Sequence, residues 1–308
     1  MALGLRLWSL VLIMGLLEGG NTQAYGTYGA PHLLIQIDSG ENFTVGLMAG
    51  ENAIGGWWKE KFKFYPRVVH VSVPFGIRRI GEHAFAFLPK LASVELPETL
   101  THIGPYALAN TNLSSIEVPP GLVVIGDHAF SNCKALQSIS LPDTLRYVGE
   151  HAFFGCAALR SVVMPSAVEV IGKNAFQSCA SLTSLDLPDG ITSVSEWTFY
   201  GCTSLTTVRF PLDLRKIGDF AFLGCSSLSA LYLPASLVEI GQSAFAACTS
   251  LEFVELPENL DTLGDSAFRG CSALGTIDLP PALTTTGVDS FPPSTNVRRA
   301  VSATGKAD

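Results

Sequence analysis

Apolar residues recur through most of the chain with a period of 23 residues. The repeating unit reads Leu-Pro-x-x-Leu-x-x-Ile-Gly-x-x-Ala-Phe-x-x-Cys-x-x-Leu-x-x-Val-x, as in Leu233–Glu255. Repetition at this length is typical of solenoids, in which each unit is one coil that buries its apolar side chains against its neighbours. Ten prolines follow the period, with intervals of 23 residues and one of 22: Pro74, Pro97, Pro119, Pro142, Pro165, Pro188, Pro211, Pro234, Pro257 and Pro280.

The pattern predicts a leucine-rich-repeat solenoid of ten coils over residues 73–295. A single coil has too few apolar side chains to offset the entropy lost on ordering its backbone, so each coil depends on the stack. Apolar and polar positions alternate in the segment Leu-x-x-Val-x-Leu-Pro, for example Leu159–Pro165. This alternation predicts one short parallel strand per unit, ended by a proline that has no N–H for the ladder.

Two further columns complete the expected coil. Glycine occupies one position in nine of the ten units, and Ser195 replaces it in the sixth. We interpret this column as a turn that requires a positive φ. Ala-Phe then begins a short helical or 3-10 turn, and we expect its phenylalanines to point inward as a buried spine: Phe130, Phe153, Phe176, Phe199, Phe222, Phe245 and Phe268.

Seven cysteines also lie 23 residues apart, so neighbours should stack about 5 Å apart, a separation that a disulfide tolerates. Parallel side chains and an odd number oppose complete pairing, and free cysteine behaves as a small buried hydrophobe. We expect a ladder of buried thiols, with partial disulfide formation as the alternative. A metal site is disfavoured because Cys-x-x-Cys pairs and Cys/His groups are lacking. The column is Cys133, Cys156, Cys179, Cys202, Cys225, Cys248 and Cys271.

The first 24 residues have the layout of a secretory signal peptide. Arg6 precedes an apolar segment, Leu7–Leu17, and small residues at Thr22 and Ala24 suit cleavage after Ala24. The apolar segment is shorter than the roughly 20 residues that cross a bilayer, and no second run of that length follows. We therefore expect a secreted or cell-surface protein with no transmembrane segment after cleavage.

The remaining flanks are short. We assign residues 25–72 to an N-terminal cap over the first coil, with Trp57 and Trp58 covering its apolar end. Residues 296–308 are assigned to a polar C-terminal tail. Asn42 and Asn112 begin Asn-x-Ser/Thr sequons, which makes them possible N-glycosylation sites in an organism that glycosylates its exported proteins.

Three parts of the repeat carry a family resemblance: Leu-Pro at the unit start, Ile-Gly-x-x-Ala-Phe, and Cys-x-x-Leu. They resemble the BspA-type leucine-rich repeats of bacterial and protist surface proteins, and the resemblance covers residues 73 to about 291. Members of that family are typically exported surface proteins, and several are implicated in attachment to host matrix proteins or to other cells. The resemblance therefore implies binding rather than catalysis.

The charge balance argues against a nucleic-acid partner. Acidic residues number 27 against 19 Lys and Arg, the net charge is −8, and the longest basic cluster is the Arg298–Arg299 pair. Binding to a phosphate backbone leaves a basic footprint that this composition lacks.

The search for catalytic chemistry finds only isolated candidates. Asp38 begins an Asp-Ser-Gly sequence after an apolar strand, as in aspartic proteases, but that chemistry needs two carboxyls sharing a proton and no second such motif occurs. His128 and His151, each preceded by an acid, should be neighbours and could hold a metal or respond to pH. An exposed variable position is the simpler interpretation. We expect no enzyme, cofactor or metal site.

The outward positions of the predicted strands suggest where a partner binds. They are mostly Ser, Thr and acidic residues, but Arg209, Tyr232 and Phe253 come from three successive units and interrupt this pattern with residue types enriched at binding hot spots. Val163 is a further apolar exception, and Trp197 completes the candidate binding residues. A purely structural role for the two aromatics, as a cross-strand pair, stays open.

We therefore expect a recognition or adhesion protein whose exposed strand face binds a protein, with extracellular-matrix and cell-surface proteins as candidate partners. The alternative is a non-catalytic scaffold inside the cell or the secretory pathway. A hydrolase that uses Asp38 is a remote third possibility.

Overall fold

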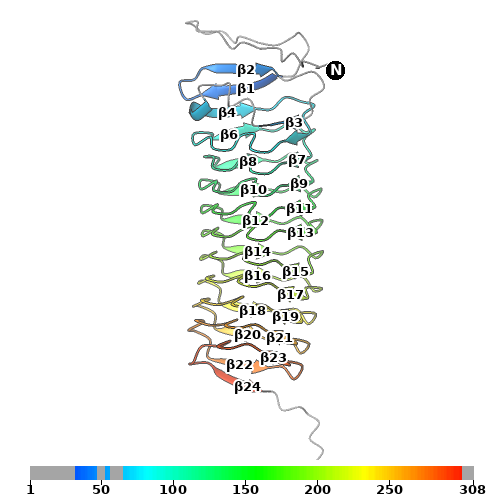
Figure 1. Cartoon of the computed structure of the whole chain (residues 1–308), viewed down its shortest axis with the longest axis vertical. Coiled ribbons are helices and arrows are strands. Elements are labelled where there is room, and N and C mark those ends of the chain that lie inside the picture. The colour runs from blue at the N-terminus through cyan, green and yellow to red at the C-terminus, as the bar shows by residue number, and fades with distance from the viewer. Residues whose placement is uncertain (1–31, 47–52, 56–64, 300–308) are drawn as a thin grey trace, which may run out of the picture.

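The structure is a computed structural model that describes residues 32–46, 53–55 and 65–299. These residues form a single stack of coils with a nearly straight axis (Figure 1). The predicted leucine-rich-repeat solenoid is confirmed. One strand of every coil belongs to a first column of parallel strands: β4 (Val68–Ser72), β6 (Ser93–Glu95), β8 (Ser115–Glu117), β10 (Ser138–Ser140), β12 (Ser161–Val163), β14 (Ser184–Asp186), β16 (Thr207–Arg209), β18 (Ala230–Tyr232), β20 (Phe253–Glu255), β22 (Thr276–Leu279) and β24 (Asn296–Arg299).

Each coil also has a second, two-residue strand, which the sequence pattern did not predict. It lies just before the glycine position, where a β-branched or leucine side chain is buried and the residue before it faces outward, except in the last of these strands, Thr285–Thr286, where both residues are exposed. The second column runs parallel to the first: β3 (Ala53–Ile54), β5 (Arg79–Ile80), β7 (His102–Ile103), β9 (Val124–Ile125), β11 (Tyr147–Val148), β13 (Val170–Ile171), β15 (Ser193–Val194), β17 (Lys216–Ile217), β19 (Glu239–Ile240), β21 (Thr262–Leu263) and β23 (Thr285–Thr286).

The Ala-Phe segments form turns, and the expected helical or 3-10 turns are absent from them. The one helical segment among the described residues is a 3-10 turn, Tyr65–Arg67, before β4. Two residues before each phenylalanine the backbone takes a positive φ, 56° at His128. Alternate N–H groups of the turn bond to the next coil, as His128 N does to Glu150 O (2.7 Å) and Phe130 N to Ala152 O (2.8 Å). The N–H groups between them bond back within the turn, as Ser131 N does to His128 O (3.0 Å), so the continuous run of bonds within a segment that a helix needs does not form.

Glycine is required at the glycine column for a reason other than the positive φ expected from the sequence. None of these nine glycines has a positive φ; the left-handed residue follows two positions later. A Cβ on any of them would instead lie within 3.0 Å of backbone atoms of the preceding coil, and at Gly172 it would lie 2.5 Å from Glu150 N. Glycine is required here because successive backbones approach too closely for a side chain.

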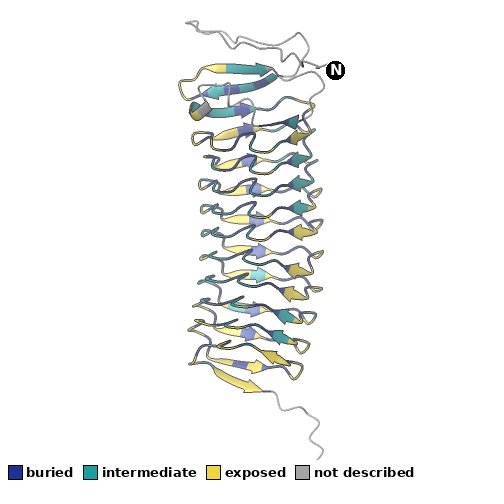
Figure 2. Cartoon of the chain, in the orientation of Figure 1, coloured by how far each residue is buried: buried dark blue, intermediate teal, exposed yellow. Residues whose placement is uncertain are grey.

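The core fills the inside of the coils. All seven predicted spine phenylalanines are fully buried, and consecutive rings of this spine stack with centroids 5.1–5.7 Å apart. Strand residues alternate between this interior and solvent (Figure 2). Each coil therefore buries its apolar side chains mainly against the coils before and after it.

The two ends of the stack differ. At the N-terminal end, β1 (His32–Ile37) pairs antiparallel with both β2 (Asn42–Gly46) and β4, and buries Leu33, Ile35 and Ile37 completely. At the C-terminal end, residues 296–299, expected in the polar tail, form β24 instead. This strand could not be predicted from the sequence, because all four of its residues are exposed and lack the alternation of apolar and polar residues that marks a half-buried strand.

The close approach at the glycine column generates a stability prediction. Gly172→Ala should lower the free energy of unfolding by about 1–3 kcal/mol, the usual cost of overpacking, because the new methyl meets backbone that cannot move alone. Urea denaturation followed by circular dichroism measures the change. The matched control is Gly275→Ala, where a Cβ meets nothing within 4 Å and φ is not left-handed. Equal effects of the two substitutions would contradict the role assigned to the glycine column.

Candidate functional site

The strand face is formed by the outward residues of the first column. In each three-residue strand the first and third side chains point to solvent and the middle one points into the core. Parallel pairing in register, Ser138 with Ser161 for example, places equivalent residues of successive coils side by side. The outward residues therefore form two straight columns, mostly of Ser, Thr, Asp and Glu, on a flat surface.

Two aromatic side chains interrupt this polar surface. Tyr232 is 72% exposed and Phe253 is 47% exposed, and their rings lie 5.8 Å apart, tilted by 41°. They come from β18 and β20, which pair so that Ala230 lies opposite Phe253. We call Tyr232 and Phe253 the aromatic patch. The rings contact each other yet keep large exposed areas, so their mutual contact does not bury them.

Arg209 and Val163 lie on the same strand face. Val163 is 79% exposed. Arg209 forms ion pairs with Asp189 (Nη1–Oδ1, 3.3 Å) and Asp186 (Nε–Oδ2, 3.9 Å), so its charge is already balanced within the chain. Sequence reasoning missed Leu212, which follows β16 and is 84% exposed. Its position just after the repeat proline is polar in five of the ten units, and Phe75 at the same position of the first unit is likewise 78% exposed.

Trp197 lies in a different column from the aromatic patch. It occupies the left-handed position of its turn, with φ 59°, and stacks on Phe220 of the next coil at 4.2 Å. Tyr200 packs edge-on against it at 5.1 Å. The sequence named Trp197 as a candidate binding residue, and the structure places it on the turn side of the coil, in the column of His128 and His151.

The two candidate histidines belong to this same turn column. His128 stacks on His151 at 4.4 Å and on Tyr106 at 4.3 Å, with planes 7° and 5° apart. Parallel stacked rings direct their nitrogen lone pairs alongside one another instead of toward a shared ion. No group of three or more His, Cys, Asp or Glu residues suited to a metal ion occurs in the described parts of the chain.

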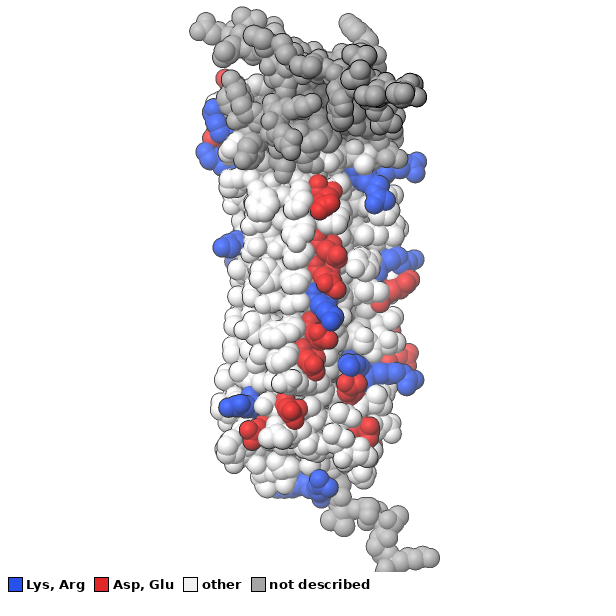
Figure 3. All heavy atoms as spheres, viewed as in Figure 1, with Lys and Arg blue, Asp and Glu red and all other residues white. Residues whose placement is uncertain are grey.

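The residues next to these histidines form an acidic line. Figure 3 shows acidic side chains in a row parallel to the long axis, with one basic side chain within the row. The position after the glycine column supplies such a row: Glu82, Asp127, Glu150, Lys173, Glu196, Asp219 and Asp265. Three of its aspartates accept a backbone N–H from the next coil, such as Glu150 N to Asp127 Oδ1 at 2.9 Å. These carboxylates thus take part in holding the coils together.

Asp38 is engaged by two cations. Its carboxylate contacts Lys90 Nζ at 2.6 Å and Arg67 Nε at 2.7 Å, and these hydrogen bonds lower the pKa of Asp38 below its usual value of 3.8. A protease dyad needs a second carboxyl that shares a proton with the first. The contacts of Asp38 instead fit an ion-pair link between β1 and the first coils.

The seven cysteines are free and buried. Each Sγ from Cys156 to Cys271 donates to the carbonyl of the spine phenylalanine 26 residues earlier, as Cys202 does to Phe176 O at 3.2 Å. Burial raises the pKa of Cys202 to about 12. A thiol held as a neutral hydrogen-bond donor is neither a nucleophile nor a metal ligand.

Other predicted features have simpler positions. Asn42 lies in β2 and Asn112 in a loop, and both are exposed. Residues 1–24, Trp57 and Trp58 lie outside the described residues. Over the described ranges, no helical segment has the length and apolar character needed to cross a bilayer.

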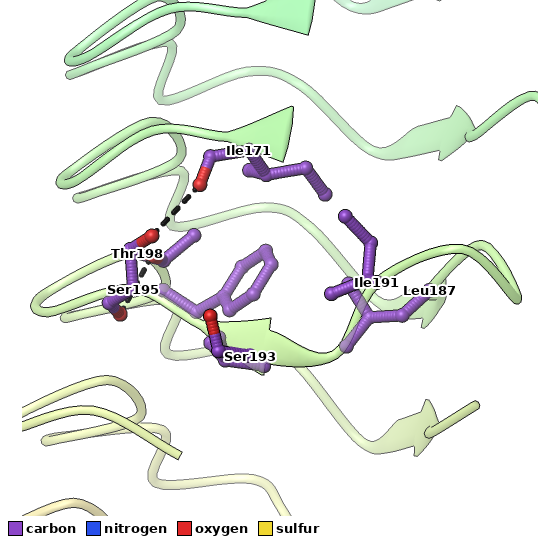
Figure 4. Close-up of a pocket in the computed structure, with 8 residues that line it drawn as sticks. Ile171, Leu187, Ile191, Ser193, Ser195 and Thr198 are labelled. Atoms are coloured by element: carbon purple, nitrogen blue, oxygen red, sulfur yellow. Dashed lines mark hydrogen bonds between the residues drawn. The ribbon is translucent and has the colours of Figure 1, made fainter. Parts of the chain in front are cut away.

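Where Ser195 replaces glycine, the stack is irregular. The second strand column divides between β13 and β15, and Ser195 Oγ donates to Ile171 O at 2.9 Å (Figure 4). The adjacent pocket is lined mainly by apolar side chains such as Ile191 and Phe199 and has essentially no room for a water molecule. Small-molecule sites usually measure about 300–1,000 Å³, so this pocket is too small to serve as one.

The histidine column generates a prediction about pH. Desolvation by burial lowers the pKa of both His128 and His151 below 6.5. The charge of the neighbouring His151 lowers the pKa of His128 further. Below pH 6.5 the unfolded chain then binds more protons than the folded chain, so the free energy of unfolding falls as the pH decreases. The urea midpoint should be lower at pH 5.5 than at pH 7.5.

A double variant, His128→Asn with His151→Asn, should reduce this pH dependence. Asparagine already occupies the same left-handed position at Asn174. His102, whose pKa burial also lowers, remains in the variant and should leave a smaller slope. Asp38 stays ionised over this range and does not contribute. An unchanged slope in the double variant would contradict the assignment.

Comparison with solved structures finds other leucine-rich-repeat chains. Similar chains include leucine-rich repeat proteins from Bacteroides ovatus (22% identity, TM-score 0.39, 87% of this chain and 90% of that one) and Eubacterium ventriosum (19%, 0.44, 90% and 96%). A leucine rich cell surface protein from Faecalibacterium prausnitzii matches with 19% identity, TM-score 0.36, and 92% and 96% coverage. Comparison with curated proteins found no match.

The family assignment rests on the repeat itself. Residues 59–183 and 169–298 match the model of the BspA type leucine rich repeat region, which spans six copies. Together the matches include both strand columns from β5 onward, the turns, the glycine column and the buried spine. The chain therefore belongs to the BspA-type leucine-rich-repeat family.

Proposed function

We propose that this chain is a secreted or cell-surface recognition protein that binds a protein partner through the strand face. The observation that carries the proposal is the aromatic patch: Tyr232 and Phe253 stay 72% and 47% exposed on a face made mostly of small hydroxyl and acidic residues. Tyrosine is among the residues most enriched at binding hot spots, and large exposed apolar side chains on a flat surface favour protein association.

The scaffold favours binding at this position. The strands that carry the patch are fixed by pairing and by fully buried neighbours such as Leu251, so little backbone entropy is lost when a partner docks. Glu255 and Asp278 follow Tyr232 in its column and form a polar rim beyond the rings. Because Arg209 is already paired with two aspartates, we assign the contact energy mainly to the rings and the role of Arg209 to the rim.

The surroundings of the patch favour a protein surface over a small molecule. Aromatic rings surrounded by polar side chains match the usual anatomy of an interface, in which an apolar centre is enclosed by a polar rim. The proposed partners are extracellular-matrix and cell-surface proteins, in keeping with the family resemblance and with the signal-like segment at residues 1–24.

A substitution pair tests the aromatic patch. Tyr232→Glu with Phe253→Ser should weaken binding to a partner, found in a panel of purified matrix and cell-surface proteins, by at least roughly tenfold, because loss of a hot spot costs about 2 kcal/mol or more. Surface plasmon resonance measures the affinity. The matched control is Val170→Ser with Val238→Ser, which removes two exposed apolar side chains at the second strand column, one in β13 and one just before β19 (45% and 37% exposed).

Circular dichroism and the thermal midpoint should stay unchanged in both double variants, since the substituted side chains lie outside the core. A partner that binds the wild type and the patch variant equally would exclude the patch. Equal weakening by the control pair would point to a different face or to a general loss of apolar surface.

The alternative function is a non-catalytic scaffold inside the cell or the secretory pathway. N-terminal sequencing of the protein produced in its native host, or in a secretory host, distinguishes the two. Export with cleavage predicts Tyr25 as the first residue of protein recovered from the medium or the cell surface. Protein that begins at Met1 and stays inside the cell would favour the scaffold.

A further inference from the structure

The left-handed turn positions form a ladder of stacked rings along the side of the solenoid. His83, Tyr106, His128 and His151 stack in sequence with centroids 4.3–4.7 Å apart. Two coils after His151, Trp197 begins a second stacked pair with Phe220 at 4.2 Å. The coil between the two runs carries Asn174 instead of a ring, at the same left-handed backbone position (φ 57°).

Three residues later in each of these coils, a second column of aromatic rings is interrupted in the same coil. Phe154 lies 5.7 Å from His151 in its own coil, and Tyr200 lies 5.1 Å from Trp197 in its own coil. The coil between them carries Gln177. Two side-chain amides, Asn174 and Gln177, thus lie between two pairs of rings. We call these two amides the amide step.

Backbone bonds fix the three coils in this order. His151 N donates to Lys173 O (2.9 Å), the residue just before Asn174 in the next coil. Asn174 N donates in the same way to Glu196 O (3.1 Å), just before Trp197, so His151, Asn174 and Trp197 lie in three successive coils. All members of the amide step and the flanking ring pairs are partly exposed. Within the described parts of the chain neither side-chain amide has a hydrogen-bond partner, so both keep donors and acceptors for a ligand.

A second, independent feature coincides with the amide step. The coil of Asn174 and the coil of Trp197 are the two between which β13 and β15 fail to pair. The spine rings Phe176 and Phe199 of these coils lie 5.7 Å apart, against 5.1 Å in the coil pairs before and after. These two coils are therefore further apart at their second strands and spine rings, while their turns stay hydrogen-bonded, as Phe176 N is to Thr198 O at 2.9 Å.

The charges beside the amide step favour a cation. Glu150, Glu196 and Asp219 flank it, against two ammonium groups. Lys173 pairs with Glu196 at 3.0 Å, and Lys216 pairs with Glu239 at 2.8 Å while also interacting with Asp219 and Glu196. Lys173 and Glu196 are both about half exposed, and exposed ion pairs contribute little, so Glu196 can exchange Lys173 for another cation. Burial keeps the pKa of His151 below 6.5, so its ring is neutral at pH 7.5 and does not repel a cation.

We propose that the amide step and its flanking rings bind an arginine side chain of a protein partner. The guanidinium is planar and stacks on aromatic faces, best on tryptophan, and its five N–H donors suit carboxylate and amide oxygens. Trp197 supplies the stacking face, Asn174 and Gln177 supply amide oxygens, and Glu196 supplies the countercharge. This contact lies on the turn side of the coils and does not rest on the strand-face proposal.

The test follows the indole N–H signal of Trp197 by NMR while blocked Gly-Arg-Gly peptide is titrated at pH 7.5. Trp197→Phe assigns the signal. The arginine peptide should shift it saturably, and the matching lysine and citrulline peptides should bind at least about threefold more weakly, because the first lacks the planar group and the second lacks the charge.

Asn174→His is the decisive variant. It completes the ring ladder with a residue that the same column already carries at His128 and His151, so the fold and Trp197 are retained. It should weaken the arginine peptide at least about fivefold, because the place of the guanidinium is then taken by a ring. Glu196→Gln should also weaken binding.

Three outcomes would overturn the proposal. The first is no saturable shift with the arginine peptide at millimolar concentrations. The second is equal affinity for the lysine or the citrulline peptide, which would leave only charge attraction or non-specific stacking. The third is unchanged affinity in Asn174→His. Urea denaturation of each variant verifies that it is folded, so a loss of response reports the site and not the stack.

Discussion

The close contact between the backbones of successive coils is the constraint on which the rest of this structure depends. At the glycine column the backbones approach so closely that a Cβ would overlap the preceding coil, and hydrogen bonds join the coils at both strand columns and at the turns. This contact brings the spine phenylalanines into stacking distance and makes the surface a set of straight columns. A residue such as Tyr232 therefore has neighbours 23 positions away in sequence, and a binding surface can form from single residues of successive units.

The repeat made most of the fold predictable, because the core positions of a solenoid recur in every unit. The period, the first strand column, the inward phenylalanines and the buried cysteines all follow from that recurrence. The second strand column was not predictable from alternation, since two residues are too short to show a period. The role of the glycines was also misassigned, because a sequence shows that a side chain is missing but not whether φ or a neighbouring backbone excludes it.

The candidate sites show the same division. Tyr232 and Phe253 were identified from sequence because they break a column of small polar residues, and the columns themselves follow from the register. The ion pairs of Arg209 with Asp186 and Asp189 were not identified, because Asp189 belongs to a turn whose position relative to β16 only the coordinates give. The column of Trp197 could be predicted from the repeat, since it is the column of His128 and His151. The left-handed backbone at that position could not, because a tryptophan gives no indication of it.

Ser195 shows how the stack accommodates a departure from its own rule. In the other coils the glycine N–H donates to the preceding coil, as Gly172 N does to Val148 O. The alanine N–H returns to the glycine carbonyl, except in the last coil, where the hydroxyl of Ser290 donates to Gly287 O at 2.6 Å. At the wider junction the Ser195 hydroxyl reaches Ile171 O instead, and Thr198, in place of alanine, donates its hydroxyl to Ser195 O at 2.8 Å. The two substitutions supply longer donors where the backbone donors are displaced, so the carbonyl groups stay satisfied. A wider spacing is thus tolerated only where polar side chains extend the hydrogen bonds, and this sequence meets that condition at the coil where its ring ladder is interrupted.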